Sequence, residues 1–274
     1  FMKITPLSTH IGALVEDIDL SLITDDQFND LHRIFLRYKA LFFRDQVLTP
    51  KVHLALGKRF GELEPVHPFF PHVEDEKQVI IIETSLGNPP GESYWHTDMT
   101  WKQVPPKCSI LHAQYVPNVG GDTIWCNMAA VWCDLPETEK AYLRTLDVSH
   151  ELHAFKGSRY DKEEGDGLSY ADKVSQQYEP VIRSMVQIHP ETQDEVLYIN
   201  EQYTRSVVGL SSTESKVVLS RLFAKAREEQ YQVRFSWQAW SVAIWDNRIT
   251  QHFAVTDYGD TPRKLHRVTV QGEV

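Results

Sequence analysis

Short strand-like runs that do not alternate with helices constrain the fold of this chain more than any other feature. Each run is rich in β-branched or aromatic residues and is bounded by residues that favour turns. The runs cover residues 40–43, 78–83, 108–115, 121–127, 181–189, 195–200, 241–246 and 267–271. A doubly wound parallel sheet requires strands and helices in alternation. We therefore expect a mainly β chain with flanking helices, built on a β-sandwich or jelly-roll core.

Four segments show the apolar periodicity and the end signals of helices. They cover residues 24–38, 49–60, 136–146 and 212–229. In the second segment Thr49 is followed by Pro50, a residue suited to the first turn, and the segment closes at Gly61. No internal repeat or low-complexity linker divides the chain. We expect a single domain over residues 2–274.

The segment 155–179 is the least regular part of the chain. It is polar, contains Gly157, Gly165 and Gly167, and shows no convincing period. A long irregular insert in a compact domain is often a lid or a binding loop. A plain surface loop is the alternative, and the sequence leaves both readings open.

Charge and cysteine content limit the partners of the chain and its compartment. The net charge is −10, whereas nucleic acids and anionic membranes select basic patches, although a few local arginines can still bind a small anion. The three cysteines include no C-x-x-C motif, which favours free thiols in a reducing compartment. Neither a signal peptide nor a run of roughly 18–20 apolar residues is visible. We expect a cytoplasmic protein without nucleic-acid or membrane partners.

A possible metal site begins in YWHTDMTW, residues 94–101. If this stretch is a strand, His96 and Asp98 project from the same face, because residues i and i+2 of a strand do so. A third ligand from another strand is offered by His252, which follows a β-rich run and a polar turn. Two imidazoles and one carboxylate form the facial triad of non-haem Fe(II) oxygenases. Zinc more often takes a tetrahedral site, and composition does not choose between the two metals.

Two arginines lie close to the third candidate ligand in the sequence. Arg263 and Arg267 are four residues apart in an extended segment, so their side chains face the same way. Two guanidinium groups aimed into one pocket repel each other unless anions lie between them, and each can bind a carboxylate or sulfonate through paired N–H groups. The pair favours two anion sites beside the metal, one for a cosubstrate and one for a substrate.

Three blocks of this sequence resemble the signature blocks of the taurine dioxygenase family. They are WHTDMTW (95–101), GGDTIW (120–125) and WDNRITQHFAVTDYGDTPRKLHR (245–267), and residues 40–50 and 59–72 extend the resemblance. The resemblance implies a double-stranded β-helix, or jelly-roll, fold. It also implies an Fe(II)- and 2-oxoglutarate-dependent dioxygenase that uses O2 to hydroxylate a C–H bond of a small anionic substrate, giving succinate and CO2.

The resemblance assigns roles to five positions around the metal. It implies that His96, Asp98 and His252 bind Fe(II) and are the catalytic centre. Arg263, eleven residues after the second histidine ligand, would form a salt bridge with the far carboxylate of 2-oxoglutarate. The hydroxyl of Thr123 would contact the same cosubstrate.

Five further positions correspond to the substrate pocket of the family. Arg267 and His67 match residues that hold the substrate sulfonate, and Tyr203 matches an aromatic residue of the pocket wall. Two positions depart from the taurine enzyme, because Phe70 replaces a tyrosine and Glu92 replaces an asparagine near the substrate amine. Glu92 could pair with a cationic substrate group or point to solvent, so the departures leave the substrate open among sulfonates, sulfates, carboxylates and zwitterions.

Two other functions use the same residues. A zinc hydrolase could employ the triad, but it leaves Arg263 and Arg267 unexplained and lacks an obvious general base. A non-catalytic jelly-roll binding protein would be favoured by a missing ligand, and none of the three is missing. The resemblance further implies a homo-oligomer.

Overall fold

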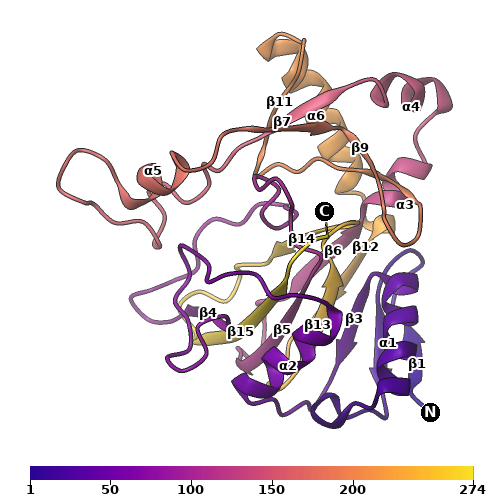
Figure 1. Ribbon diagram of the computed structural model, residues 1–274, viewed down its shortest axis with the longest axis vertical. Coiled ribbons are helices and arrows are strands. Elements are labelled where there is room, and N and C mark those ends of the chain that lie inside the picture. The colour runs from indigo at the N-terminus through magenta and orange to yellow at the C-terminus, as the bar shows by residue number, and fades with distance from the viewer. Residues whose placement is uncertain (274) are drawn as a thin grey trace.

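The computed structural model describes residues 1–273, and its largest element is a seven-stranded sheet. The strand order is β1 (Lys3–Pro6), β2 (Ala13–Glu16), β3 (Ala40–Phe43), β13 (Val242–Asp246), β5 (Cys108–Tyr115), β15 (Arg263–Val270) and β4 (Ile80–Thr84). Only the β2–β3 pair is parallel, and the other neighbours are antiparallel. The large sheet occupies the lower half of the molecule in Figure 1.

A three-stranded sheet packs on the inner face of the large one. Its order is β12 (Gln232–Phe235), β6 (Thr123–Asn127) and β14 (Thr250–Ala254). Aromatic side chains join the two layers: the Phe42 ring stacks on Phe235 with centroids 4.4 Å apart and meets Trp125 edge-on at 5.2 Å. Two sheets packed face to face around such a core, with helices outside, confirm the predicted mainly β jelly-roll class.

Two helices cover the outer face of the large sheet. These are α1 (Asp25–Tyr38) and α2 (Pro50–Phe60), and a 3-10 turn, η1 (Leu20–Leu22), precedes them. Thr24 forms a capping box with Gln27, and Thr49 caps α2 ahead of Pro50, so the end signals in the sequence place both helices correctly. Their apolar faces pack on the sheet, where Phe35 and Phe60 meet edge to face at 5.4 Å.

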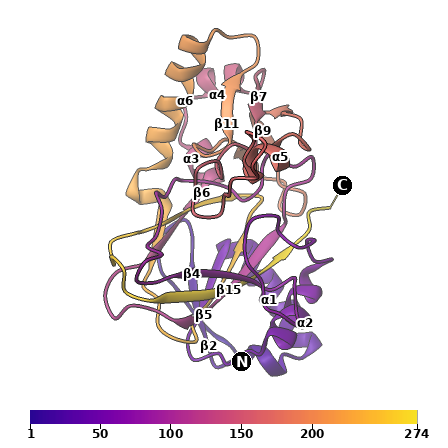
Figure 2. The same cartoon turned by 90° about the vertical axis from the view of Figure 1, so that its left-hand side faces the viewer.

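The remaining elements form an upper, helix-rich part (Figures 1 and 2). It contains α3 (Met128–Cys133), α4 (Glu137–Leu143), α5 (Tyr170–Ser175), α6 (Ser212–Ala226) and η2 (Glu229–Tyr231), together with β7 (Asp147–His150), β8 (Val181–Ser184), β9 (Val186–Ile188), β10 (Glu195–Leu197) and β11 (Thr204–Val207). These strands form two small sheets, β11-β7-β8 and β10-β9. None of the helices in residues 1–273 has the length and apolar character needed to span a lipid bilayer.

Several predicted elements differ from the structure. The strand expected at 181–189 is divided into β8 and β9 by the fully buried Met185. The strand assumed for 94–101 is absent: His96 forms a single isolated bridge, and the chain turns at Asp98, followed by Met99 at φ 50°. Six further strands were not predicted from the sequence: β1, β2, β7, β11, β12 and β14.

The insert at 155–179 has a defined packing partner. The Phe155 ring stacks on Phe69 with centroids 4.1 Å apart and an interplanar angle of 5°. Tyr170 donates a hydrogen bond from its hydroxyl to the Pro68 carbonyl at 2.7 Å, and a capping box at Ser169 starts the short helix α5. The insert thus lies against residues 68–70.

Gly57 tests how tightly α2 packs on β15. A Cβ atom at Gly57 would lie 2.6 Å from Val268 Cγ1 and 2.9 Å from Leu63 Cδ2. Overpacking of this kind costs about 1–3 kcal/mol, which exceeds the gain of about 1 kcal/mol that alanine brings to a helix interior. We expect Gly57→Ala to lower the urea midpoint, and Gly91→Ala, where an added Cβ has nothing within 4 Å, to leave it nearly unchanged. A Gly57→Ala protein as stable as the wild type would contradict this packing.

His53 predicts a pH dependence of stability. Its side chain is 1% exposed, and burial, aided by His112, lowers its pKa to about 3. In the unfolded chain His53 takes up a proton near pH 6.5, whereas in the folded chain it stays neutral down to about pH 3. The contribution of neutral His53 to the free energy of unfolding is therefore present above pH 6.5 and is lost as the pH falls toward 3. Between pH 6 and 4, His53→Gln should reduce the fall in the free energy of unfolding by up to about 1.4 kcal/mol per pH unit. Urea unfolding at each pH measures this quantity. Above pH 7.5 the plots of the free energy of unfolding against pH should run parallel for the wild type and His53→Gln. Equal slopes below pH 6 would count against a neutral, buried His53.

Candidate active site

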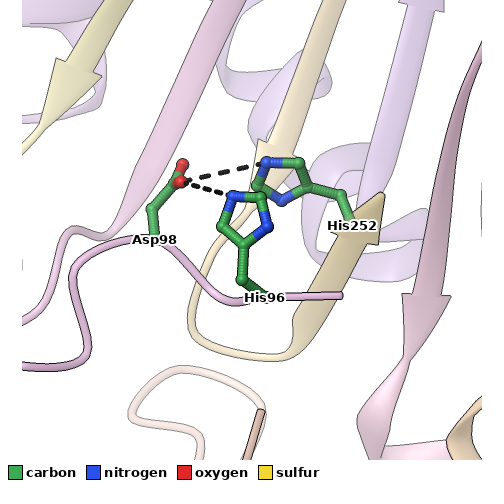
Figure 3. Close-up of side chains that lie close together, drawn as sticks. All are labelled: His96, Asp98 and His252. Atoms are coloured by element: carbon green, nitrogen blue, oxygen red, sulfur yellow. Dashed lines mark ion pairs between the residues drawn. The ribbon is translucent and has the colours of Figure 1, made fainter. Parts of the chain in front are cut away.

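Two of the candidate ligands are joined directly through their backbones. His252 lies in the middle of β14, and His96 runs antiparallel beside it as an isolated bridge. The His96 N–H donates to the His252 carbonyl at 3.1 Å, and the His252 N–H donates to the His96 carbonyl at 2.8 Å. The two imidazoles consequently emerge side by side with ring centroids 4.1 Å apart (Figure 3).

The third candidate, Asp98, faces both imidazoles from the turn that follows His96 (Figure 3). Its Oδ1 lies 3.3 Å from His96 Nε2 and 3.8 Å from His252 Nε2, and one donor atom from each residue lies within 4.8 Å of the others. The structure therefore brings together the three predicted ligands. The assumption of a strand was wrong, but its consequence, that His96 and Asp98 face one point, is correct because the turn redirects the carboxylate.

The charge state of these groups suits a cation. Burial opposes ionisation of Asp98, but Arg267 and the two histidines hold the pKa of its carboxyl below the usual range. Burial, with His96, lowers the pKa of His252 to about 3. Asp98 Oδ2 and His252 Nδ1 are buried without a hydrogen-bond partner among the described residues. Neutral imidazole beside a carboxylate with a free oxygen fits a divalent transition metal.

Arg263 forms a second feature of the site, on the first residue of β15. Its side chain is 7% exposed and donates from Nη2 to the Gly121 carbonyl at 3.2 Å, while Nε has no partner within residues 1–273. Gly121 has φ +73°, a conformation that favours glycine, and a Cβ there would lie 3.2 Å from Arg263 Nε, so a larger residue would be strained and would crowd the guanidinium. A buried guanidinium without a carboxylate partner favours binding of an anion.

Thr123 lies in the same region, on β6. Its Oγ1 accepts a hydrogen bond from Trp237 Nε1 at 3.0 Å and is buried. Since the indole N–H occupies one acceptor position, the hydroxyl hydrogen is free to donate to a ligand oxygen.

Arg267 lies nearer the triad, on the same face of β15 as Arg263, as the four-residue spacing predicted. Its Nη1 is 3.7 Å from Asp98 Oδ2, and its guanidinium lies 5.2 Å from the Phe70 ring centroid. Burial, with Arg267, lowers the pKa of His67 to about 3. The backbone N–H groups of residues 69 and 70 donate to His67 Nδ1, so the neutral ring carries its proton on Nε2. Arg267 and His67 thus supply a cation and a neutral donor.

All ten residues singled out from the sequence line one cavity of about 570 Å³. They are His67, Phe70, Glu92, His96, Asp98, Thr123, Tyr203, His252, Arg263 and Arg267. Glu92 is exposed at the rim, where its carboxylate raises the pKa of Tyr94. Tyr203 is 4% exposed and lies edge-on to His96 at 6.5 Å.

The cavity residues that come from the insert at 155–179 were not predicted from the sequence. Phe155, Arg159 and Tyr160 line the cavity, and the Tyr160 ring lies 4.7 Å from Phe70. Arg159 donates to the Tyr160 hydroxyl at 2.6 Å and to Asn88 Oδ1 at 3.3 Å, which joins the insert to the opposite rim. The only signal in the sequence was the length and irregularity of the insert, because no period marks which side chains turn inward.

Comparisons with known proteins agree with this geometry. The sequence model described as "Taurine catabolism dioxygenase TauD, TfdA family" matches residues 3–269. An alkylsulfatase of Acinetobacter baylyi is 35% identical, with 100% of this chain and 86% of that protein covered. An alpha-ketoglutarate-dependent sulfate ester dioxygenase of Pseudomonas putida is 31% identical over 100% of this chain and 90% of that protein. The crystal structure of a taurine dioxygenase from Burkholderia xenovorans superposes with a TM-score of 0.85 at 33% identity, covering 100% of this chain and 90% of that one.

The triad predicts stabilisation by metal. Adding Mn(II) at about 100 times its dissociation constant should raise the free energy of unfolding by about 2.7 kcal/mol, since the ion binds only the folded chain. Differential scanning calorimetry should show a higher Tm for the wild type and no change for Asp98→Ala or His252→Ala. The control is His10→Ala, which removes an exposed histidine and should keep the wild-type shift. A shift that persists in Asp98→Ala would show that the metal binds elsewhere.

Proposed function

The chain belongs to the TauD/TfdA family of dioxygenases, and from that premise we propose that it oxidatively cleaves a sulfate ester of an aliphatic alcohol. Iron(II)- and 2-oxoglutarate-dependent hydroxylation of a small anionic substrate is the activity of the family. This membership disfavours the zinc hydrolase and the non-catalytic binding protein. The proposal concerns the substrate and the role of each residue.

In the proposed site His96, Asp98 and His252 hold iron(II), which together with 2-oxoglutarate and O2 supplies the C–H hydroxylation chemistry. Arg263 binds the distal carboxylate of 2-oxoglutarate, since it is buried with no ion-pair partner among the described residues and its Nε has no hydrogen-bond partner there. Thr123 donates its hydroxyl to the same carboxylate. Both residues orient the cosubstrate, and orientation of reacting groups accounts for much of the catalysis a protein can provide.

Arg267 and His67 bind the sulfate group in this proposal. The guanidinium neutralises the anion, and the imidazole donates from Nε2. Because Arg267 Nη1 lies 3.7 Å from Asp98 Oδ2, an anion held there places the first carbon of its chain beside the metal centre. Hydroxylation of that carbon gives an unstable α-hydroxy sulfate, which breaks its C–O bond to release an aldehyde and hydrogen sulfate, while 2-oxoglutarate becomes succinate and CO2.

The observation that carries the choice of substrate is the apolar wall beside Arg267. Phe70, Phe155 and Tyr160 lie together, with Phe70 to Tyr160 at 4.7 Å and Phe70 to Phe155 at 5.9 Å between centroids. An aliphatic tail buries apolar area against this wall, whereas Glu92, the carboxylate that could pair with the ammonium group of taurine, is exposed at the rim. The names of the two curated relatives, an alkylsulfatase and a sulfate ester dioxygenase, support the same class.

We propose that residues 155–179 are a lid within one domain that spans residues 2–274. The aromatic contacts of Phe155 with Phe69 and the hydrogen bond from Arg159 to Asn88 support this role, because a closed lid excludes water from the reacting carbon. A cytoplasmic location and a homo-oligomer are also part of the proposal. Light scattering after size-exclusion chromatography measures the oligomeric state.

A succinate-release assay tests the substrate. We expect turnover with hexyl sulfate to exceed turnover with taurine, because only hexyl sulfate has a tail that packs against the apolar wall.

Two variants test the residues of the site. Arg267→Ala should lose substrate-dependent succinate release but keep the anaerobic charge-transfer band of iron(II) with 2-oxoglutarate. Phe70→Ala should raise KM for hexyl sulfate by about 10-fold or more, from the roughly 1.5–3 kcal/mol of a buried Phe contact.

Arg33→Ala, which removes an exposed surface arginine paired with Asp30, is the matched control for charge. Equal turnover of taurine and hexyl sulfate would remove the sulfate-ester proposal and leave the dioxygenase assignment intact. Absence of the charge-transfer band in the wild type would remove the proposed metal and cosubstrate residues.

A further inference from the structure

Asp98 has no strand to hold it, although it faces two histidines that are fixed by one. In an antiparallel ladder the next hydrogen-bonded pair after His96 and His252 is Asp98 and Thr250. A continued ladder would join the Asp98 N–H to the Thr250 carbonyl. The ladder stops after one bridge, because the chain turns at Asp98.

Side chains satisfy the two groups of the missing bond from the Asp98 N–H to the Thr250 carbonyl. The Asp98 N–H donates to Asn247 Oδ1 at 2.8 Å, and the Thr250 carbonyl accepts from Thr97 Oγ1 at 2.8 Å. Asn247 Nδ2 also donates to the Asp98 carbonyl at 3.0 Å and to the Pro106 carbonyl at 3.1 Å. The amide of one side chain thus makes the two bonds to Asp98 that a neighbouring strand would make.

Asn247 is itself rigidly held. It is 0% exposed, and its backbone N–H donates to the Lys107 carbonyl at 2.9 Å. The preceding Asp246 ends β13 and accepts hydrogen bonds from Arg248 and the buried His189, each at 2.8 Å to its Oδ2. A buried amide with three of its four hydrogen bonds made, on a turn fixed by an ion-paired network, has little freedom to move.

From these contacts we infer that Asn247 is a positioning residue for Asp98: its side chain replaces the missing strand pairing and fixes the carboxylate opposite His96 and His252. The inference rests on the metal centre proposed above. Metal sites require their ligands within about 0.5 Å of the productive geometry, and loss of residues that orient ligands costs about 10- to 100-fold in metal affinity.

Asn127 provides a matched control. It is 5% exposed, its Oδ1 accepts from the backbone N–H groups of Ala129 and Ala130, and its Nδ2 donates to the His10 carbonyl. It therefore also makes three side-chain bonds to backbone groups, but none to a candidate ligand. Leucine at either position removes all three bonds, whereas aspartate keeps the acceptor oxygen.

The experiment measures Mn(II) dissociation constants by EPR titration of wild type, N247L, N247D, N127L and N127D, with the Tm of each metal-free protein from circular dichroism. We expect N247L to raise the Mn(II) dissociation constant by about 10- to 100-fold, and N247D to raise it less. Both Asn127 variants should stay within about twofold of the wild type at a comparable loss of Tm. If N247L does not fold, the Mn(II) dissociation constants of N247D and N127D are compared instead, and the inference requires a higher value for N247D.

Two results would overturn the inference: Asn247 variants that bind Mn(II) as tightly as the wild type, or Asn127 variants that lose as much affinity as their Asn247 counterparts. A wild type that binds no Mn(II) would overturn the metal centre itself, and this positioning role with it. The iron(II) and 2-oxoglutarate absorption band provides an independent readout, and we expect it to be weakened in N247L and retained in N127L.

Discussion

The reciprocal backbone hydrogen bonds between His96 and His252 are the constraint on which the site depends. They join a connecting segment to the middle of β14, two parts of the chain separated by more than half the sequence. A side-chain contact alone would leave each imidazole free to rotate about its own backbone. The paired peptide groups instead fix both Cα positions, so the sheet determines the separation of the two rings. Asp98 then needs only a short turn to approach the pair.

A second constraint is the balance of buried charge around this bridge. Arg263 and Arg267 are each 7% exposed, and Asp98, the carboxylate of the triad, lies with its Oδ2 3.7 Å from Arg267 Nη1. Burying an uncompensated charge is costly, so the cavity is at its most stable when further anions are bound. The triad carries one negative charge for a divalent metal, and the arginines carry two positive charges. A dicarboxylate and a monoanionic substrate bring these charges close to balance, which gives a physical reason for the site to bind all three components together.

The sequence predicted those parts of the fold that local signals specify. β3 and β5 begin and end where expected, and the caps at Thr24 and Thr49 place α1 and α2. Strand β14 was missed, although it carries His252, because its composition is not that of a β-rich run and its pairing with β6 is set by tertiary contacts. The ligand set was still found, because the two-residue spacing marked His96 and Asp98 and the resemblance to the family's signature blocks marked His252 with them.

The substrate end of the cavity could not be predicted in the same way, and the reason is physical. The metal side is built on β14, β15 and β6, whose residues alternate in and out with a fixed period, together with the short segment of His96 and Asp98 that is bridged to β14. The opposite wall comes from irregular segments that include Phe155 and Tyr160, where no period tells which side chains point inward. Changes in those segments can therefore alter which substrate tail fits the cavity, while β15 keeps Arg263 in place and β14, with the bridge from His252 to His96, keeps the candidate metal ligands in place. In the proposed function the strand-based side of the cavity holds the metal and cosubstrate and the irregular side contacts the substrate tail, which is consistent with a family whose relatives carry the names of enzymes for different anions.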